Sequence, residues 1–438
     1  MKKIIYILFV ALSFTGCDDY LDIEPVGQVI PTTVQDYRSF LTAAYAITKD
    51  SKILTTYRSD ELRLSANSVG IEQYEDLFIW NDLNPSPLSR AYPYATIYNI
   101  IFYANHVINS ADTMEGDALE KEQLIGEAHA LRALQYFDLI NLYAEPYNKA
   151  TASTDAGVPI TTEYDADQEF AVGTVQDVYD LILNDLNEAE VLIHTNQQEL
   201  GYNYRFSRVA VKAFKARVYL YQNEWEKAIT SSTEALAIKS SLQNLNLDGS
   251  IMPSEYNSVE SILALETVAS FDMTSNASIS DNLLSAYNQT DDLRFTTYFY
   301  EDSDGTYHSN KSADTKFKVS FRTAELYLTL AESYAHLNAI NEAKEKLIEL
   351  AANRYTSAGL DVYRLEIEGL NSENILTEVL EERQREFAIE GHRWNDLRRT
   401  TQPLLIKNYN SETYQLDQND ARYVIPFPND AVINNPNL

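Results

Sequence analysis

Two stretches of the chain share one spacing of small and aromatic residues, and this repeated spacing limits the fold more than any other feature. The first copy consists of Ala216, Tyr219, Ala228 and Ala235, at relative positions 0, 3, 12 and 19. The second copy consists of Ala331, Tyr334, Ala343 and Leu347, at relative positions 0, 3, 12 and 16. Alanines let two antiparallel helices approach closely, and the tyrosine fills the space beside the small residue. The pattern therefore predicts stacked helical hairpins.

The spacing resembles that of the tetratricopeptide repeat, a helix–turn–helix unit of about 34 residues. We expect repeat-type helix pairs near residues 92–144, 208–238 and 321–355. Such units stack into a solenoid-like scaffold. The alternative is a set of ordinary amphipathic hairpins with no repeat relationship.

Apolar periodicity predicts further helices over residues 34–48, 175–193 and 372–390. Thr174 and Ser207 stand where helix N-caps are expected.

Other stretches have no long helical period. Residues 50–90 read as loops with short elements, residues 240–318 are rich in Ser, Asn, Asp and Thr, and the last 40 residues carry several prolines and read as mostly extended. We therefore expect a mainly α fold: residues 34–438 form a single domain with a helical-repeat scaffold, an irregular, loop-rich ligand-binding half and a variable insertion at 240–318.

The formal net charge is -31. A polyanion repels phosphate backbones, so nucleic-acid binding is excluded, and electrostatic docking on anionic lipid is disfavoured. The chain also has 31 tyrosines, a side chain that is both apolar and hydrogen-bonding and is common on binding faces.

The N-terminus has the features of an export signal. Lys2 and Lys3 precede an apolar run over residues 4–12, which is too short to span a bilayer. Small residues then lead to Cys17, the one cysteine of the sequence. This arrangement resembles the lipobox of bacterial lipoproteins, which implies a signal peptide at 1–16, acylation (palmitate) of Cys17 and a lipid-anchored tether at 17–33. The alternative is an ordinary signal peptide with an unrelated cysteine.

Signatures of common enzymes are missing from the sequence: it has no His-Glu-x-x-His, Gly-x-Ser-x-Gly, Walker or Gly-x-Gly-x-x-Gly motif. Asp302-Ser303-Asp304-Gly305 has part of a calcium-loop pattern, but a solvated turn is the favoured interpretation. We predict no catalytic residues, no cofactor and no metal.

The C-terminal region carries the most specific motif. Residues 381–399 read EERQREFAIEGHRWNDLRR, and Arg422, Tyr423, Pro426 and Pro428 follow. Helical spacing predicts pairing of Glu382 with Arg385, a helix stop at Gly391, and packing of Trp394 and Leu397 against Phe387 and Ile389. The other interpretation takes Glu386, Glu390 and His392 as metal ligands or acid–base groups.

This stretch is very similar to the signature of the SusD/RagB family, in which an E-R-x-x-E-F helix runs into E-G-x-R-W-x-D-L-R-R. Further family-like positions are spread along the chain: Tyr98, Ile101 and Asn105; Arg132, Ala133, Tyr136, Phe137 and Leu139; Gly157 and Pro159; Arg322, Ala324, Glu325 and Tyr327. Two departures are Tyr94, where a tryptophan is common, and residues 349–356, which lack the usual R-x-R.

The resemblance implies a surface-exposed, lipid-anchored outer-membrane protein that binds a nutrient, an oligosaccharide or possibly a peptide, and delivers it to a SusC-like TonB-dependent transporter as a hinged lid. Two other functions stay open: an outer-membrane glycan hydrolase, and a helical-repeat scaffold without a soluble ligand.

Glycan binders place aromatic faces against sugar rings and polar side chains near the hydroxyls. In the resembled family, ligand contacts come largely from the loop region near Trp80 and from the insertion. The ligand-binding residues that we predict are Trp80, Asn81, Asp60, Arg63, Asn67, Tyr287 and Tyr300. The alternative for Trp80 is a residue of the core.

Overall fold

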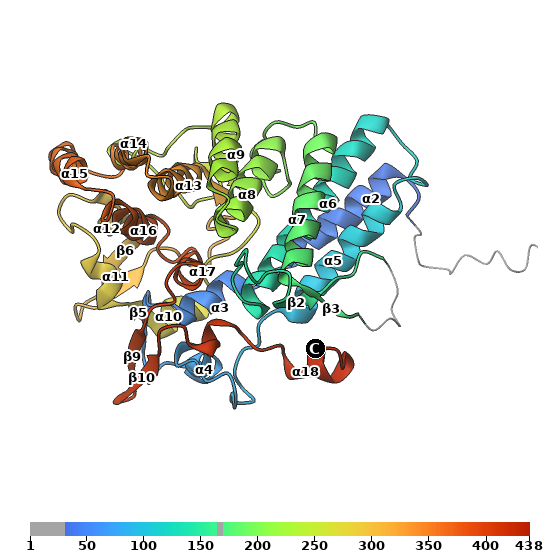
Figure 1. Ribbon diagram of the computed structural model, residues 1–438. Coiled ribbons are helices and arrows are strands. Elements are labelled where there is room, and N and C mark those ends of the chain that lie inside the picture. Colours follow the sequence, from blue (N-terminus) through green and yellow to red (C-terminus); the bar gives the residue numbers. More distant parts are fainter. Residues whose placement is uncertain (1–30, 164–169) are drawn as a thin grey trace, which may run out of the picture.

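A computed structural model describes residues 31–163 and 170–438 (Figure 1). The predicted signal peptide, Cys17 and nearly all of the tether lie outside the described residues. Within these residues, none of the helices is long and apolar enough to cross a membrane.

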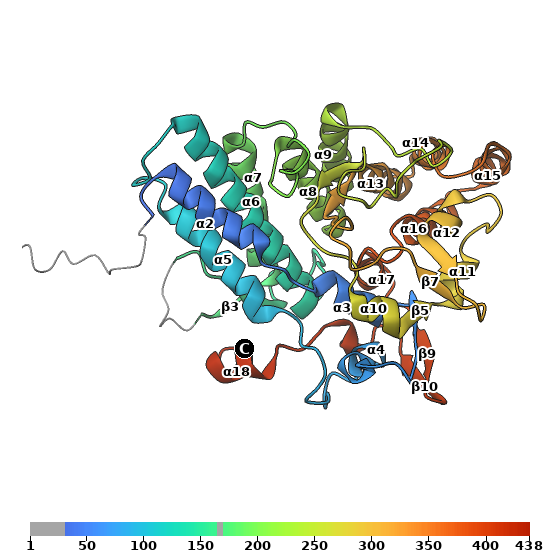
Figure 2. The same ribbon diagram turned by 180° about the vertical axis from the view of Figure 1, so that it is seen from behind.

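One half of the molecule is a layer of long helices: α2 (Val34–Ala46), α5 (Tyr94–Asn109), α6 (Ala118–Tyr143) and α7 (Val175–Leu192). Figures 1 and 2 show these helices side by side, with α2 and α5 on one side of α6. Thr33 and Thr174 each form a capping box with the aspartate three residues later, so the local sequence sets both starts. The helices predicted over 34–48, 92–112, 117–144 and 175–193 are confirmed.

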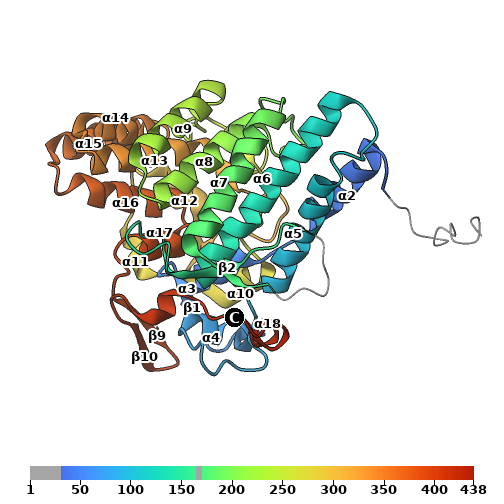
Figure 3. The same ribbon diagram turned by 45° about the vertical axis from the view of Figure 1, so that its right-hand side comes forward.

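The helix stack continues through α8 (Arg208–Tyr221), α9 (Trp225–Ile238), α13 (Thr323–His336), α14 (Ile340–Ala351) and α16 (Ile375–Glu386) (Figure 3). The shared positions Ala216, Ala228, Ala331 and Ala343 are all buried. The prediction of a mainly α fold with tetratricopeptide-like helix pairs is confirmed.

The two copies of the repeat also make the same turn. Asn223 ends α8 and Asn338 ends α13, each with φ of 59°. In both turns the next backbone N–H donates to the carbonyl of the repeat tyrosine, Tyr219 in one copy and Tyr334 in the other. This is the hydrogen bond of a Schellman-type helix end, in which asparagine accepts the left-handed conformation.

Three local predictions differ from the structure. Ser207 precedes α8, but its hydroxyl makes no capping bond and is buried without a partner. Helix α15 (Ser357–Gly369) lies where no separate helix was expected. Helix α16 ends at Glu386, before Gly391, where a left-handed backbone (φ of 76°) and close approach to Lys52 require glycine.

The other half consists of short elements, as the absence of periodicity predicted. The strand pairs are antiparallel: β1 (Leu62–Leu64) with β5 (Ala277–Ile279), β2 (Ala156–Pro159) with β3 (Val172–Thr174), β4 (Ser261–Leu263) with β8 (Phe321–Arg322), β6 (Phe299–Glu301) with β7 (Tyr307–Ser309), and β9 (Leu405–Tyr409) with β10 (Glu412–Leu416). The short helices are α3 (Ser51–Arg58), α4 (Glu75–Phe78), α10 (Phe271–Asn276), α11 (Asp281–Ser285), α12 (Leu293–Tyr298), α17 (Arg393–Arg399) and α18 (Asn429–Asn434), with 3₁₀ turns η2 (Ile71–Gln73) and η3 (Ala421–Tyr423). Residues 240–318 are irregular, as expected.

Candidate ligand-binding site

The predicted ligand residues that remain accessible lie in the irregular half of the molecule, on or beside two neighbouring strand pairs. Strand β1 pairs with β5, β7 lies beside β5, and β7 pairs with β6. We call the surface at these strand pairs the ribbon face and define it by Asp60, Arg63, Asp281, Asn282 and Tyr300. The segments near residue 60 and near residue 300, far apart in the sequence, therefore belong to neighbouring strand pairs.

Asp60 is held firmly in place. The Arg393 guanidinium donates from Nε and Nη2 to the two carboxylate oxygens of Asp60, both at 2.8 Å. Asn282 Nδ2 donates to the same carboxylate at 3.0 Å, and Ser280 Oγ donates to the Asp60 carbonyl at 2.6 Å. A bidentate arginine fixes the carboxylate in angle and position. The C-terminal signature, through Arg393, thus positions a side chain at the ribbon face.

The accessible groups of the ribbon face suit a hydroxyl-rich ligand. Tyr300 is 43% exposed, and its ring stacks on His308 at a centroid distance of 5.5 Å. Arg63 and Asp281 form an exposed ion pair at 3.1 Å. Asn67 is exposed in the loop that follows β1. An exposed aromatic ring beside carboxylate, amide and guanidinium groups can stack on a sugar and bind its hydroxyls.

The sequence prediction overlooked Phe271. This residue opens α10, which runs directly into β5, and its side chain is 75% exposed. A large aromatic side chain with so much exposure offers a second flat apolar surface near the ribbon face. In the sequence, Phe271 is one phenylalanine in a largely polar stretch. Such a pattern does not reveal whether the ring is exposed or buried.

Three predicted ligand residues are placed elsewhere. Trp80 is 1% exposed, its Nε1 donates to the Arg58 carbonyl at 3.0 Å, and it packs in a small core cluster with Trp394 and Tyr423. The prediction that Trp80 is a stacking platform is wrong, because a buried indole presents no face to a sugar. Tyr287 is also buried and donates to the Arg385 carbonyl, and Asn81 is tied to Asp76 and Asn84.

A buried charge network lies in the same half of the molecule and is built on the C-terminal signature. Its side chains are almost fully removed from solvent: Glu260, Asp292, Arg294, Lys311, Arg322, Arg354, Glu382, Glu386 and Glu390. Burial raises the pKa of Glu386, but Arg354 and Arg322 outweigh it and hold that pKa well below its usual value. Glu382 also pairs with Arg385 at 2.8 Å, as predicted.

These ion pairs decide between the two interpretations of the signature. Glu386 and Glu390 accept hydrogen bonds from arginine and lysine, which favours the structural interpretation over metal ligation or acid–base chemistry. Trp394 does not pack on Phe387 and Ile389 as expected. Instead it stacks on Tyr423 at 5.1 Å, with the Arg58 guanidinium 5.0 Å from its ring.

Glu61 links this interior to the ribbon face. Its carboxylate accepts from the Ile389 N–H at 2.8 Å and from Ser59 Oγ at 3.2 Å, and its carbonyl accepts from Ser280 N–H. Burial raises the pKa of Glu61 to about 7, against the effect of the Ile389 hydrogen bond. The segment that carries Asp60 is therefore fastened from below by the signature backbone.

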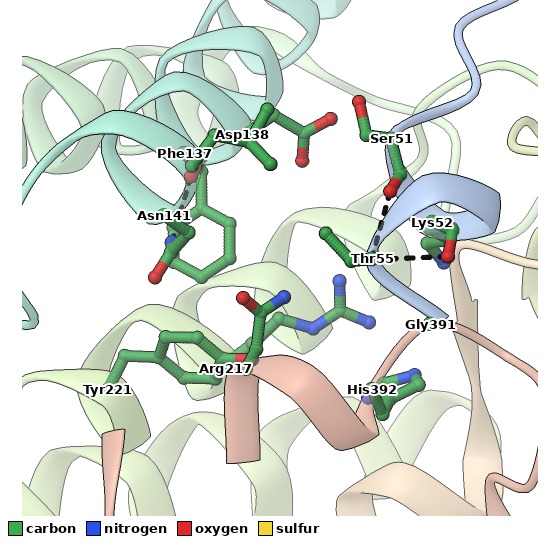
Figure 4. Close-up of a pocket in the computed structure, with 12 residues that line it drawn as sticks. Ser51, Lys52, Thr55, Phe137, Asp138, Asn141, Arg217, Tyr221, Gly391 and His392 are labelled. Atoms are coloured by element: carbon green, nitrogen blue, oxygen red, sulfur yellow. Dashed lines mark hydrogen bonds between the residues drawn. The ribbon is translucent and has the colours of Figure 1, made fainter. Parts of the chain in front are cut away.

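A small pocket of about 40 Å³ lies between α3, α6, α8 and α17 (Figure 4). The Arg217 guanidinium points into the space, with Asp138 on one side and His392 on another. Since one water needs roughly 10–15 Å³ of such volume, the cavity has room for a few waters and not for a sugar. Ser51, one of the lining residues, has a buried hydroxyl without a protein partner.

The fold defines a class: a helical-repeat scaffold joined to an irregular half with polar and aromatic side chains at its surface. Comparison with known proteins makes the class specific. A family described as starch-binding and associating with the outer membrane matches residues 19–220, and the SusD family matches residues 214–438. The chain belongs to the SusD family.

Relatives and solved structures agree with this assignment. The chain is 29% identical to "SusD-like protein P38" of Formosa agariphila, over 54% of this chain and 46% of that protein. It is 23% identical to "SusD-like protein P2" of the same organism, over 100% of this chain and 99% of that protein. A SusD superfamily protein from Bacteroides thetaiotaomicron has a TM-score of 0.77 at 20% identity, covering 92% of this chain and 98% of that one. A laminarin-binding SusD-like protein has a TM-score of 0.63 at 20% identity, covering 84% and 92%.

Proposed function

We propose that the protein binds a soluble oligosaccharide at the ribbon face and delivers it to a SusC-like TonB-dependent transporter. The observation that carries the proposal is the exposed Tyr300 ring on β6, in the strand pair that lies next to the pair of β5 and β1, and β1 carries the exposed Arg63. Family membership and the structural likeness to a laminarin-binding protein support a glycan as the ligand.

The mechanism that we propose is binding without bond cleavage. Glycoside hydrolysis needs two carboxyl groups that face the substrate about 5–10 Å apart. Here the glutamates of the signature are buried and paired with arginine, and Asp60 at the surface is clamped by Arg393. Asp281, the other carboxylate of the ribbon face, pairs with Arg63 at 3.1 Å. With its acids in ion pairs, the ribbon face is suited to recognition of a ligand rather than to its hydrolysis.

We further propose that the protein is an outer-membrane lipoprotein anchored through acylated Cys17 and exposed at the cell surface. The sequence from residue 1 to Cys17 supports the anchor. Lipid chains contribute about 0.8 kcal/mol per buried methylene, so several chains on one cysteine retain a protein at a membrane.

The test compares matched substitutions in calorimetric titrations against a panel of neutral and acidic oligosaccharides and short peptides. Tyr300→Ala and Arg63→Ala should each weaken binding of the preferred glycan about tenfold, the effect of losing about 1.4 kcal/mol. The controls Tyr202→Ala and Arg364→Ala remove exposed side chains of the same kind outside the ribbon face and should leave affinity unchanged. Equal affinity in all four variants would show that the ribbon face is not the glycan-binding site. Tighter binding of peptides than of glycans would show that the ligand is a peptide. Binding of a protein but of no soluble ligand would favour the alternative of a helical-repeat scaffold protein.

A further inference from the structure

A second cavity lies away from the ribbon face, between α5 and the C-terminal helix α18. Its volume is about 690 Å³, within the range of roughly 300–1,000 Å³ that small-molecule sites occupy. In Figure 1, α5 and α18 lie on the right of the molecule, while β6 and α11 of the insertion lie on the left. The family comparisons assign nothing to this cavity.

Aromatic rings line the cavity, and the protein holds two of them firmly. Tyr94, Tyr98, Phe102 and Phe170 all contribute to the wall. Tyr98 donates from its hydroxyl to the Pro159 carbonyl at 2.7 Å, and the Tyr94 and Tyr98 rings contact each other at 4.8 Å. Tyr94 also meets Tyr143 edge-on at 5.5 Å. The stacking surface is therefore preorganised, which lowers the entropic cost of binding.

Amide side chains of the C-terminal segment form the polar side of the cavity. Asn434 and Asn435 both line it, and Asn435 Nδ2 donates to the Phe170 carbonyl at 2.8 Å, which ties this segment to the opposite wall. The Asn434 amide donates to the Asp430 carbonyl at 2.8 Å. Aromatic faces next to amide groups are the arrangement that a pyranose ring with equatorial hydroxyls requires.

The charge of the lining restricts the ligand further. Among the described lining residues, the groups that carry charge are the carboxylates of Glu163 and Asp430, and neither lysine nor arginine is present. The whole chain adds a net charge of -31. An acidic or sulfated glycan would meet repulsion with no cation to offset it.

We propose that this cavity is a second carbohydrate-binding site, selective for neutral oligosaccharides. The choice of a carbohydrate as the ligand rests on the proposed function, whereas the cavity itself is inferred from its lining residues and their charge. The ribbon face contains Arg63, whereas the described lining of the cavity contains neither lysine nor arginine. The two surfaces should therefore differ in their tolerance for acidic sugars.

The test uses the full mature chain in which Arg63→Ala and Tyr300→Ala have been combined to silence the ribbon face. The probes are maltohexaose, laminarihexaose and xylohexaose as neutral glycans, an oligogalacturonate as the acidic glycan, and a neutral aromatic peptide. Saturation-transfer NMR and calorimetry should detect binding of at least one neutral glycan and none of the acidic one. Adding Phe102→Ala or Asn434→Ala should weaken the remaining neutral-glycan binding at least tenfold.

The matched control is Val191→Ala, which removes an exposed apolar side chain on α7 outside the cavity lining and should leave binding unchanged. Melting temperatures equal to that of the parent show that the variants are folded. If the residual glycan affinity is unchanged by both Phe102→Ala and Asn434→Ala, the cavity is not a binding site, and this result says nothing against the ribbon face. Loss of all binding in the Arg63/Tyr300 background, or stronger binding of the oligogalacturonate or the peptide at the cavity, also overturns the cavity site. If the unmodified chain binds no glycan, the proposed function fails as well.

Discussion

Substitution of Glu386 by alanine removes the centre of the buried charge network. Glu386 accepts hydrogen bonds from three arginines: from Arg294 at 2.9 Å, from Arg322 at 2.5 Å, and from Arg354 at 2.9 and 2.7 Å. Its side chain is 0% exposed, so no water replaces the lost partner. Breaking a buried ion pair from one side costs about 3–5 kcal/mol, because the remaining charge stays buried without compensation.

The expected change in melting temperature follows from the size of the chain. Unfolding entropy is about 2.1 cal/mol/K per residue, so for some 400 ordered residues a loss of 3–5 kcal/mol lowers the melting temperature by about 4–6 °C. Differential scanning fluorimetry or calorimetry measures this. The control is Glu381→Ala on the same helix, where the side chain is 53% exposed and lies 3.9 Å from Arg385, a geometry worth well under about 1 kcal/mol.

The pH dependence of the same pair of variants gives a second readout. The arginines hold the folded-state pKa of Glu386 well below its ordinary value of 4.5, so the stabilising contribution is complete above pH 4.5 and is lost as the pH falls toward the folded-state pKa. The difference between the unmodified protein and Glu386→Ala should therefore shrink in acid. Equal melting temperatures at neutral pH, or normal folding with loss of a measurable hydrolytic activity, would refute the structural role of Glu386.

Further predictions concern the repeat, the core, a buried acid and the anchor. Ala331→Leu should overpack the α13 seam, where Ala331 is fully buried, and cost about 1–3 kcal/mol in a denaturation curve; an unchanged midpoint would contradict close helix packing. Trp80→Ala should cost about 3–5 kcal/mol of stability, and a normal melting temperature would show that the indole is not core. Burial raises the folded-state pKa of Glu61 to about 7, so the protonated Glu61 stabilises the fold fully below pH 4.5, and this stabilisation is lost as the pH rises through 7. Glu61→Gln should therefore gain stability relative to the unmodified protein between pH 5 and pH 8. A difference in stability between the two proteins that does not change with pH would contradict this. Cys17→Ala should release the protein from membranes in a fractionation assay, and mass spectrometry that finds an unmodified Cys17 would exclude the anchor.

The helical scaffold is predictable from sequence because its determinants are local. The alanine spacing, the capping threonine at 174 and the apolar period of residues 117–144 act within one or two turns of helix. Helix α15 escaped prediction because its buried stripe is narrow, with Gly359, Tyr363 and Ile367 as the buried positions. A stripe of this kind gives little contrast with the surrounding polar sequence.

The site is less predictable because its determinants are distant in sequence. Local spacing predicted the Glu382–Arg385 pair, but the partners of Glu386 come from residues 294, 322 and 354, and the clamp on Asp60 comes from Arg393. Trp80 looked like a loop tryptophan, yet the residues that enclose it, Trp394 and Tyr423, lie more than 300 positions away. The accessible part of the prediction includes Arg63 on β1 and Tyr300 on β6, strands that belong to adjacent pairs.

The central claim is that the protein captures a glycan without cutting it. The most direct measurement incubates the mature protein with its best-binding oligosaccharide under saturating conditions, records the calorimetric isotherm, and then determines the chain length of the recovered glycan by chromatography. We expect a saturable isotherm, weaker binding by the Tyr300→Ala variant, and a glycan recovered at its original length. Shortened products that depend on a carboxylate of the ribbon face would contradict it and make the protein a hydrolase.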